Sequence, residues 1–226
     1  MKIIDNFLSK TYFKNISEMM ISPGFGWHGL HNLTPVSYPK QSDSRNDLEV
    51  TESSENFNKY GFSHTFWHKE KGAVSQYSSF VQPLLFQIMD VVNCDFILRA
   101  RADMVTWSKD DYIHPAHTDF PYPNTASVFY INESDGDTIF YNIKPEDVPK
   151  DKDLKEYDRV SPSPNRLVIF DGDLLHTGCS PTKHKNRILI NSNYIKKEYV
   201  EEYTDETEKK EDIKLRIKGM DNALHS

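Results

Sequence analysis

From about residue 95 onward, apolar and polar residues alternate with a period of two. Side chains along a β-strand point alternately to opposite faces, so this pattern predicts strands that bury one face. In the first such stretch the apolar positions are Leu98, Ala100, Ala102 and Met104, and the polar positions between them are Arg99, Arg101 and Asp103. Further strands are predicted at residues 112–119, 127–132, 138–141, 166–170 and 187–195, with Asp-Gly-Asp turns at 135–137 and 171–173. Many short strands with few helices favour an antiparallel sandwich or barrel.

Before residue 95 the pattern is different. After a short N-terminal strand, apolar residues at helical spacing predict helices over residues 10–20 and 77–92. Ser9 is expected to cap the first helix. Pro83 is tolerated in the second if Ser78 or Ser79 caps it, because amides of the first turn have no helical partner.

We therefore predict a mainly β fold with flanking helices, in a single domain over residues 1–200. Residues 1–94 would form an N-terminal helical layer with a polar loop at 41–59, and residues 95–196 the β core. The polar loop is either surface filler or a lid over a substrate mouth. Residues 201–226 are rich in charge and are predicted to form a solvated tail.

Composition narrows the class of protein. The chain has 226 residues and a formal charge of −7, which argues against a nucleic-acid partner, because phosphate neutralisation dominates such binding. Its two cysteines make neither a disulfide framework nor a zinc site. Without a signal-peptide pattern or an apolar run of about 20 residues, the sequence predicts a cytoplasmic protein with no membrane partner.

The strongest functional signal is His117-Thr118-Asp119, followed by His176 and then by Arg187. Two imidazoles and one carboxylate are the ligand set of the facial triad of non-haem Fe(II) oxygenases, which leaves other metal positions open. Arg187 offers a bidentate fork for a second carboxylate, such as that of a keto-acid co-substrate. A rival pair, His68-Lys69-Glu70, has no comparable downstream partners and is rejected.

These residues and the motifs around them resemble the Fe(II)/2-oxoglutarate-dependent dioxygenases, within them the prolyl-hydroxylase-like branch. The resemblance covers residues 98–195 and rests on the order and spacing of several motifs. They are His117-Thr118-Asp119, Phe129-Tyr130-Ile131-Asn132, Gly136 to Phe140, Pro164 to Phe170, His176-Thr177-Gly178 and Arg187. It implies a double-stranded β-helix, or jelly roll, core.

The resemblance also implies roles for individual residues. His117, Asp119 and His176 would be the catalytic metal ligands, and Arg187 would pair with the far carboxylate of 2-oxoglutarate. Tyr130 would donate its hydroxyl to the same carboxylate, although an aromatic core residue is the alternative. For the other two candidates, Trp107 would be a wall of the co-substrate site, and Asn191 would assist the carboxylate or satisfy a buried amide.

The expected function is that of an oxidoreductase, a dioxygenase that uses Fe(II), 2-oxoglutarate and O2, with ascorbate as a candidate reductant. It would hydroxylate a C–H bond of a peptidyl or small-molecule substrate and release succinate and CO2. Asn193 stands where nucleic-acid demethylases of this superfamily carry a second arginine, so that branch is disfavoured. Two alternatives stay open: a non-catalytic jelly-roll binding module, and a hydrolytic cupin-like metalloenzyme with zinc or manganese.

Overall fold

A computed structural model describes residues 1–30, 60–148, 154–196 and 199. The predicted loop at 41–59 and the predicted tail at 201–226 lie outside the described residues. Within the described part, no helix combines the length and apolar character needed to cross a lipid bilayer.

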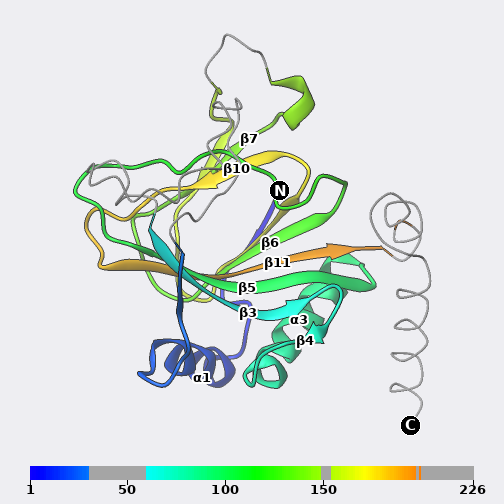
Figure 1. Cartoon of the computed structure of the whole chain (residues 1–226), viewed down its shortest axis with the longest axis vertical. Coiled ribbons are helices and arrows are strands. Elements are labelled where there is room, and N and C mark those ends of the chain that lie inside the picture. Colours follow the sequence, from blue (N-terminus) through cyan, green and yellow to red (C-terminus); the bar gives the residue numbers. More distant parts are fainter. Residues whose placement is uncertain (31–59, 149–153, 197–198, 200–226) are drawn as a thin grey trace.

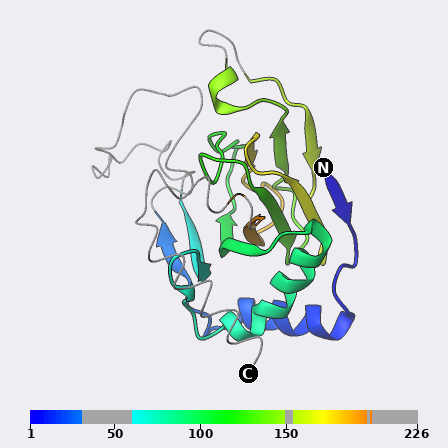
Figure 2. The same cartoon turned by 90° about the vertical axis from the view of Figure 1, so that its right-hand side faces the viewer.

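Two antiparallel sheets face each other, as Figures 1 and 2 show. The larger sheet has the order β1-β9-β6-β11-β5-β3-β2, with β4 paired to β3; the smaller has the order β10-β7-β8. The strands of the larger sheet are β1 (Lys2–Ile4), β2 (His28–Leu30), β3 (Gly61–His68), β4 (Gly72–Ala73), β5 (Phe96–Thr106), β6 (Thr125–Tyr130), β9 (Leu167–Asp171) and β11 (Asn186–Ile195). Those of the smaller sheet are β7 (Thr138–Tyr141), β8 (Asp158–Val160) and β10 (Leu175–Gly178). The predicted jelly-roll architecture is confirmed.

Two helices, α1 (Lys10–Ile21) and α3 (Ser78–Val92), cover the outer face of the larger sheet (Figure 1). Ser9 caps α1 as predicted, because its hydroxyl accepts a hydrogen bond from the Tyr12 amide at 3.4 Å. The predicted serine cap of α3 is wrong. Tyr77 occupies the N-cap, and the Ser78 hydroxyl instead donates to the Phe66 carbonyl at 2.6 Å, which fastens the helix to β3.

Because side chains alternate along β5, its two faces lie in different environments. Ala100 and Ala102 of β5 are fully buried in the core between the sheet and the helices. Arg101 and Asp103, which alternate with them, line a cavity between the two sheets. The outer face of β5 therefore builds the core, while its inner face presents charged side chains.

The structure departs from the predicted strands at residues 112–119 and in four strands that were not predicted, β3, β4, β8 and β10. Residues 112–119 form no continuous strand; they make isolated bridges, among them Ile113 to Cys179 and His117 to His176. Pro115 has no amide hydrogen and restricts the residue before it, so a ladder cannot run through this segment. The strand β3 was missed, and since it pairs with β5, the sheet is not confined to residues 95–196.

Asn165 fastens the N-terminal segment to the turn before β9. It has a positive φ of 63°, and its buried side-chain amide exchanges hydrogen bonds of 2.8 and 2.9 Å with the backbone of Leu8. Asn165→Ala should lower the free energy of unfolding by about 2–4 kcal/mol, because it strands buried polar groups of Leu8 and keeps a strained φ. Urea denaturation measures this loss. Asn165→Gly, which relieves only the backbone strain, should lose less; an alanine variant as stable as the parent would contradict the prediction.

Candidate metal centre

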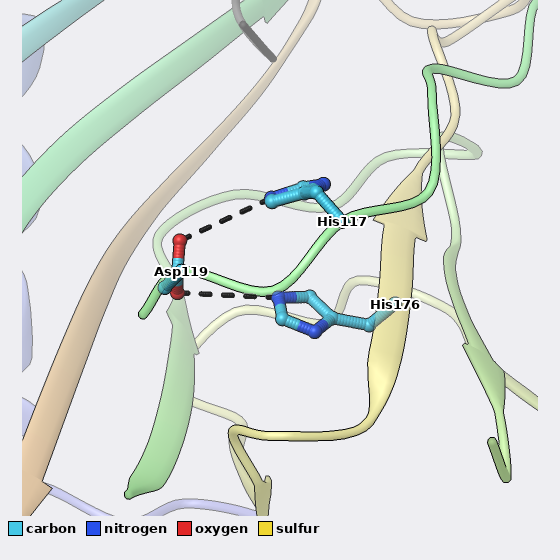
Figure 3. A group of neighbouring side chains, drawn as sticks. All are labelled: His117, Asp119 and His176. Atoms are coloured by element: carbon cyan, nitrogen blue, oxygen red, sulfur yellow. Dashed lines mark ion pairs between the residues drawn. The ribbon is translucent and has the colours of Figure 1, made fainter. Parts of the chain in front are cut away.

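Three side chains meet at one edge of the smaller sheet. His117 and His176 exchange two backbone hydrogen bonds of 3.0 Å, which hold their ring centroids 4.9 Å apart. Asp119 follows on the same segment, and one ligand atom from each residue lies within 4.8 Å of the others. Figure 3 shows the two imidazoles and the carboxylate directed at a common point. The backbone bridge explains how a segment without regular strand structure still places His117 beside His176.

Hydrogen bonds to the backbone fix the orientation of both imidazoles. The Nδ1 atoms of His117 and His176 lie 3.1 and 3.0 Å from the carbonyl oxygens of Pro115 and Leu174. A carbonyl only accepts, so each Nδ1 carries the proton and each Nε2 presents a lone pair. Each Nε2 lies 3.9 Å from an Asp119 oxygen, and that of His176 is buried without a hydrogen-bond partner among the described residues. An orphaned, oriented imidazole nitrogen suits a metal ion.

The electrostatic environment favours the metal-binding protonation states. Burial lowers the pKa of His117 to about 4, with a further contribution from His176. Burial alone would raise the pKa of Asp119, but the Arg99 guanidinium and the two imidazoles hold it well below its usual value. At neutral pH the site thus presents a neutral His117 and an ionised carboxylate, the forms that bind divalent metals.

The Asp119 carboxylate is held by three donors. The Arg99 guanidinium donates to its Oδ1 at 2.5 Å, and the side-chain amides of Asn191 and Asn193 donate to its Oδ2 at 3.2 and 3.0 Å. The sequence predicted that Asn191 assists the co-substrate carboxylate or satisfies a buried amide; in the structure its amide donates to Asp119, and the residue lies in the cavity wall. The roles of Arg99 and Asn193 were missed, although Arg99 belongs to the alternation read in the sequence.

A cavity opens between the sheets, and His117, His176 and Arg187 of β11 lie in its wall. This arginine is 5% exposed. Its Nη2 donates to the Thr138 hydroxyl at 2.6 Å, while its Nε is buried without a partner. Among the described residues no carboxylate pairs with Arg187, in contrast to Arg99 and Arg101. A buried, uncompensated cation is unfavourable, so this corner suits an anionic ligand.

Comparison with known proteins places this arrangement in context. No protein-family model matches the sequence, and no curated protein matches it. Solved structures do match. A prolyl hydroxylase from Trichoplax adhaerens, in complex with a peptide fragment of the hypoxia-inducible factor oxygen degradation domain, has a TM-score of 0.53 and 13% identity, over 89% of this chain and 86% of that one. A 2OG-Fe(II) oxygenase family oxidoreductase from Burkholderia pseudomallei has a TM-score of 0.55 and 10% identity, over 85% and 84%.

The fold is that of the 2OG-Fe(II) oxygenases. A third similar structure, the non-heme α-ketoglutarate-dependent epimerase SnoN from nogalamycin biosynthesis, has a TM-score of 0.54 and 6% identity, over 86% of this chain and 77% of that one. At such identities the likeness establishes architecture. The resemblance expected from the sequence is thus confirmed for the fold, which hosts more than one reaction among these neighbours.

Two expected cavity residues lie elsewhere. Tyr130 is fully buried and does not line the cavity; its hydroxyl lies 2.5 Å from that of Thr138, and its ring lies beneath the Arg187 guanidinium. Trp107 does not line the cavity: it is 55% exposed, and its indole N–H donates to the Thr182 carbonyl at 2.8 Å. The reason is that β5 ends at Thr106, so the alternation that turns Val105 inward no longer orients Trp107.

A second charged pair shares the cavity wall. Arg101 and Asp103 lie two residues apart on the inner face of β5, with Nε and Oδ1 2.7 Å apart and Nη2 donating to Oδ2 at 3.2 Å. Burial raises the pKa of Asp103, and Arg101 opposes that shift. The rejected pair His68 and Glu70 is about two-fifths exposed, and no third ligand joins it among the described residues.

Proposed function

We propose that this chain is an Fe(II)- and 2-oxoglutarate-dependent dioxygenase that hydroxylates a C–H bond of a peptidyl or small-molecule substrate. One atom of O2 enters the hydroxylated product and the other enters succinate, which forms from 2-oxoglutarate with release of CO2. One observation carries the proposal: His117 and His176 of the candidate metal site line the same cavity as Arg187, a buried arginine that pairs with no carboxylate among the described residues. The peptide bound by the Trichoplax enzyme supports including peptides, prolyl ones among them, in the substrate class.

Different residues would bind the metal and the far carboxylate of 2-oxoglutarate. His117, Asp119 and His176 would hold iron, which supplies the oxidative chemistry when bound, and three ligands leave positions open for other partners. Arg187 would hold the far carboxylate of 2-oxoglutarate. Thr138, fixed by the Tyr130 hydroxyl, orients the guanidinium from one side. Arg99 and the two asparagines keep the Asp119 carboxylate ionised and in place.

The two alternatives leave Arg187 unexplained. A hydrolytic cupin-like metalloenzyme needs the metal and a water, and a non-catalytic module needs neither the oriented imidazoles nor the unpaired guanidinium. A buried cation without a paired anion is energetically costly. Its presence beside a candidate metal site, with no carboxylate paired to it among the described residues, favours a dicarboxylate ligand.

A turnover assay tests the proposal. Purified protein is incubated aerobically with Fe(II), ascorbate and 2-oxoglutarate, with and without a panel of peptides and small molecules, and succinate is measured. We expect succinate that depends on Fe(II) and on 2-oxoglutarate and that rises with a substrate. The matched control is the Asp119→Ala variant, which should form none. Absence of both succinate formation and 2-oxoglutarate binding in the parent protein would overturn the proposal.

A further inference from the structure

The Arg101–Asp103 pair lies in the same cavity as Arg187, but on β5, the strand that flanks β11 on one side. On β11, Arg101 pairs in register with Asn191, which contacts Asp119. Arg187 instead makes its contacts toward the other flank, with Thr138 of β7 and with the ring of Tyr130 of β6, whose centroid lies 5.7 Å from the guanidinium carbon. Among the described residues, the contacts of Arg187 therefore leave the inner face of β5 available to a ligand other than 2-oxoglutarate.

The polar surface continues from β5 onto β3. Thr65 is opposite Arg101, and Ser63 is opposite Asp103. Residues that are paired directly across an antiparallel ladder point to the same face of the sheet. Thus the hydroxyl groups of Ser63 and Thr65 extend the polar surface of Arg101 and Asp103 onto β3. Apolar side chains would cost less to bury at these positions.

Arg101 and Asp103 do not use their full hydrogen-bonding capacity on each other. Arg101 Nε and Asp103 Oδ1 lie 2.7 Å apart, yet both atoms are buried without a hydrogen bond of acceptable geometry among the described residues. Arg99 differs, because it is committed to Asp119 and Asn193. A buried ion pair with imperfect geometry does not repay its desolvation, so it is poor evidence for a purely stabilising role. Both groups retain capacity for another partner, since a guanidinium has five N–H donors and a carboxylate about four acceptor sites.

The charges define the complementary ligand. One cation and one anion side by side match a ligand that carries one anion and one cation close together. A ligand that carries only a carboxylate would be repelled by Asp103, and one that carries only an ammonium group would be repelled by Arg101. A residue within a peptide chain has neither charge on its backbone.

We propose that Arg101 and Asp103 bind the prime substrate, and that this substrate is a free α-amino acid. Its α-carboxylate pairs with Arg101 and its α-ammonium with Asp103, which holds the side chain's C–H bonds near the three metal ligands. This inference rests on the proposed function and narrows its substrate class to a zwitterionic small molecule.

Calorimetry on the full chain, loaded anaerobically with Fe(II) and 2-oxoglutarate, tests the inference. The probes are the twenty proteinogenic L-amino acids, and for each that binds, its Nα-acetyl and α-carboxamide forms. We expect at least one free amino acid to bind and to stimulate succinate formation in air. Each blocked form should bind on the order of 30-fold more weakly or worse, since it leaves one buried charge unpaired. Equal binding of the blocked forms, preference for peptides, or no binding by any free amino acid would overturn the inference.

Variants assign the effect to the pair. Asp103→Asn and Arg101→Gln should each weaken amino-acid binding by a similar factor and leave the affinity for 2-oxoglutarate unchanged. Where a single change impairs folding, Arg101→Met combined with Asp103→Leu removes both charges and should keep the fold while losing the amino acid. Arg159→Gln, in the exposed pair with Glu156, is the matched control and should change nothing.

The same titration distinguishes failure of the amino-acid substrate class from failure of the proposed dioxygenase function. If 2-oxoglutarate binds and no amino acid does, only the substrate class is wrong. If 2-oxoglutarate itself does not bind, the proposed function fails. A double variant that binds the amino acid like the parent would show that the pair serves the fold alone.

Discussion

Asp119→Ala and His176→Ala proteins are expected to lose Fe(II) binding and turnover while keeping their fold. Each change removes one of three protein ligands. Because loss of even an outer-sphere partner commonly costs about 10–100-fold in metal affinity, loss of a direct ligand should exceed about 100-fold. The fold should persist, because neither residue belongs to the hydrophobic core between the larger sheet and its helices. In Asp119→Ala the Arg99 side chain, 20% exposed, keeps Asn193 and the Phe120 ring as contacts.

Anaerobic calorimetry with Fe(II) measures the affinity, and circular dichroism with urea denaturation checks the fold. His68→Ala is the matched control, since that histidine is partly exposed and belongs to no three-residue metal-binding group in the described part of the chain. It should bind Fe(II) like the parent protein. If the Asp119 and His176 variants also bind like the parent, the three residues are not the metal site.

The candidate ligands could be found in the sequence because they are recognised by their chemical type and their order. Few combinations of side chains hold a metal with open positions, and His117, Asp119 and His176 keep that combination in the expected order. The geometry that unites them could not be read from the sequence. The prediction assumed that His117 and Asp119 share one face of a strand. Instead, the backbone bridge between His117 and His176 of β10, in a segment interrupted at Pro115, brings the three side chains together.

The residues around the ligands were harder to predict, because their roles depend on neighbours distant in sequence. The alternation in β5 showed that Arg99, Arg101 and Asp103 share a face, but not that this face lines a cavity. Thr138 lies within the Gly136 to Phe140 motif, but nothing in that motif shows that its hydroxyl contacts Arg187. Trp107 was misplaced because counting positions along the chain cannot show where β5 ends.

Arg187→Ala should nearly abolish binding of 2-oxoglutarate while leaving Fe(II) affinity close to that of the parent. A dicarboxylate with one end near the metal places its other carboxylate deep in the cavity, where an unpaired charge is strongly penalised. Removing one partner of a buried ion pair costs about 3–5 kcal/mol, or roughly two to four orders of magnitude in affinity. Fe(II) binding should persist, because no contact joins Arg187 to the three ligand side chains in the described part of the chain.

Two further variants sharpen the test of Arg187. Arg187→Lys should recover only part of the affinity, because an ammonium cannot make the bidentate contact of a guanidinium. Gly178→Ala keeps the arginine but would place a methyl group 2.7 Å from its Nη1, so the guanidinium must shift and 2-oxoglutarate should bind more weakly. Arg159→Ala removes a partly exposed arginine at the edge of the smaller sheet and serves as the control.

Calorimetry with 2-oxoglutarate on anaerobic, Fe(II)-loaded proteins gives the affinities. A hydrolytic enzyme or a binding module has no such affinity to lose, so an Arg187→Ala protein that binds 2-oxoglutarate as well as the parent, or a parent that does not bind it, would exclude the dioxygenase.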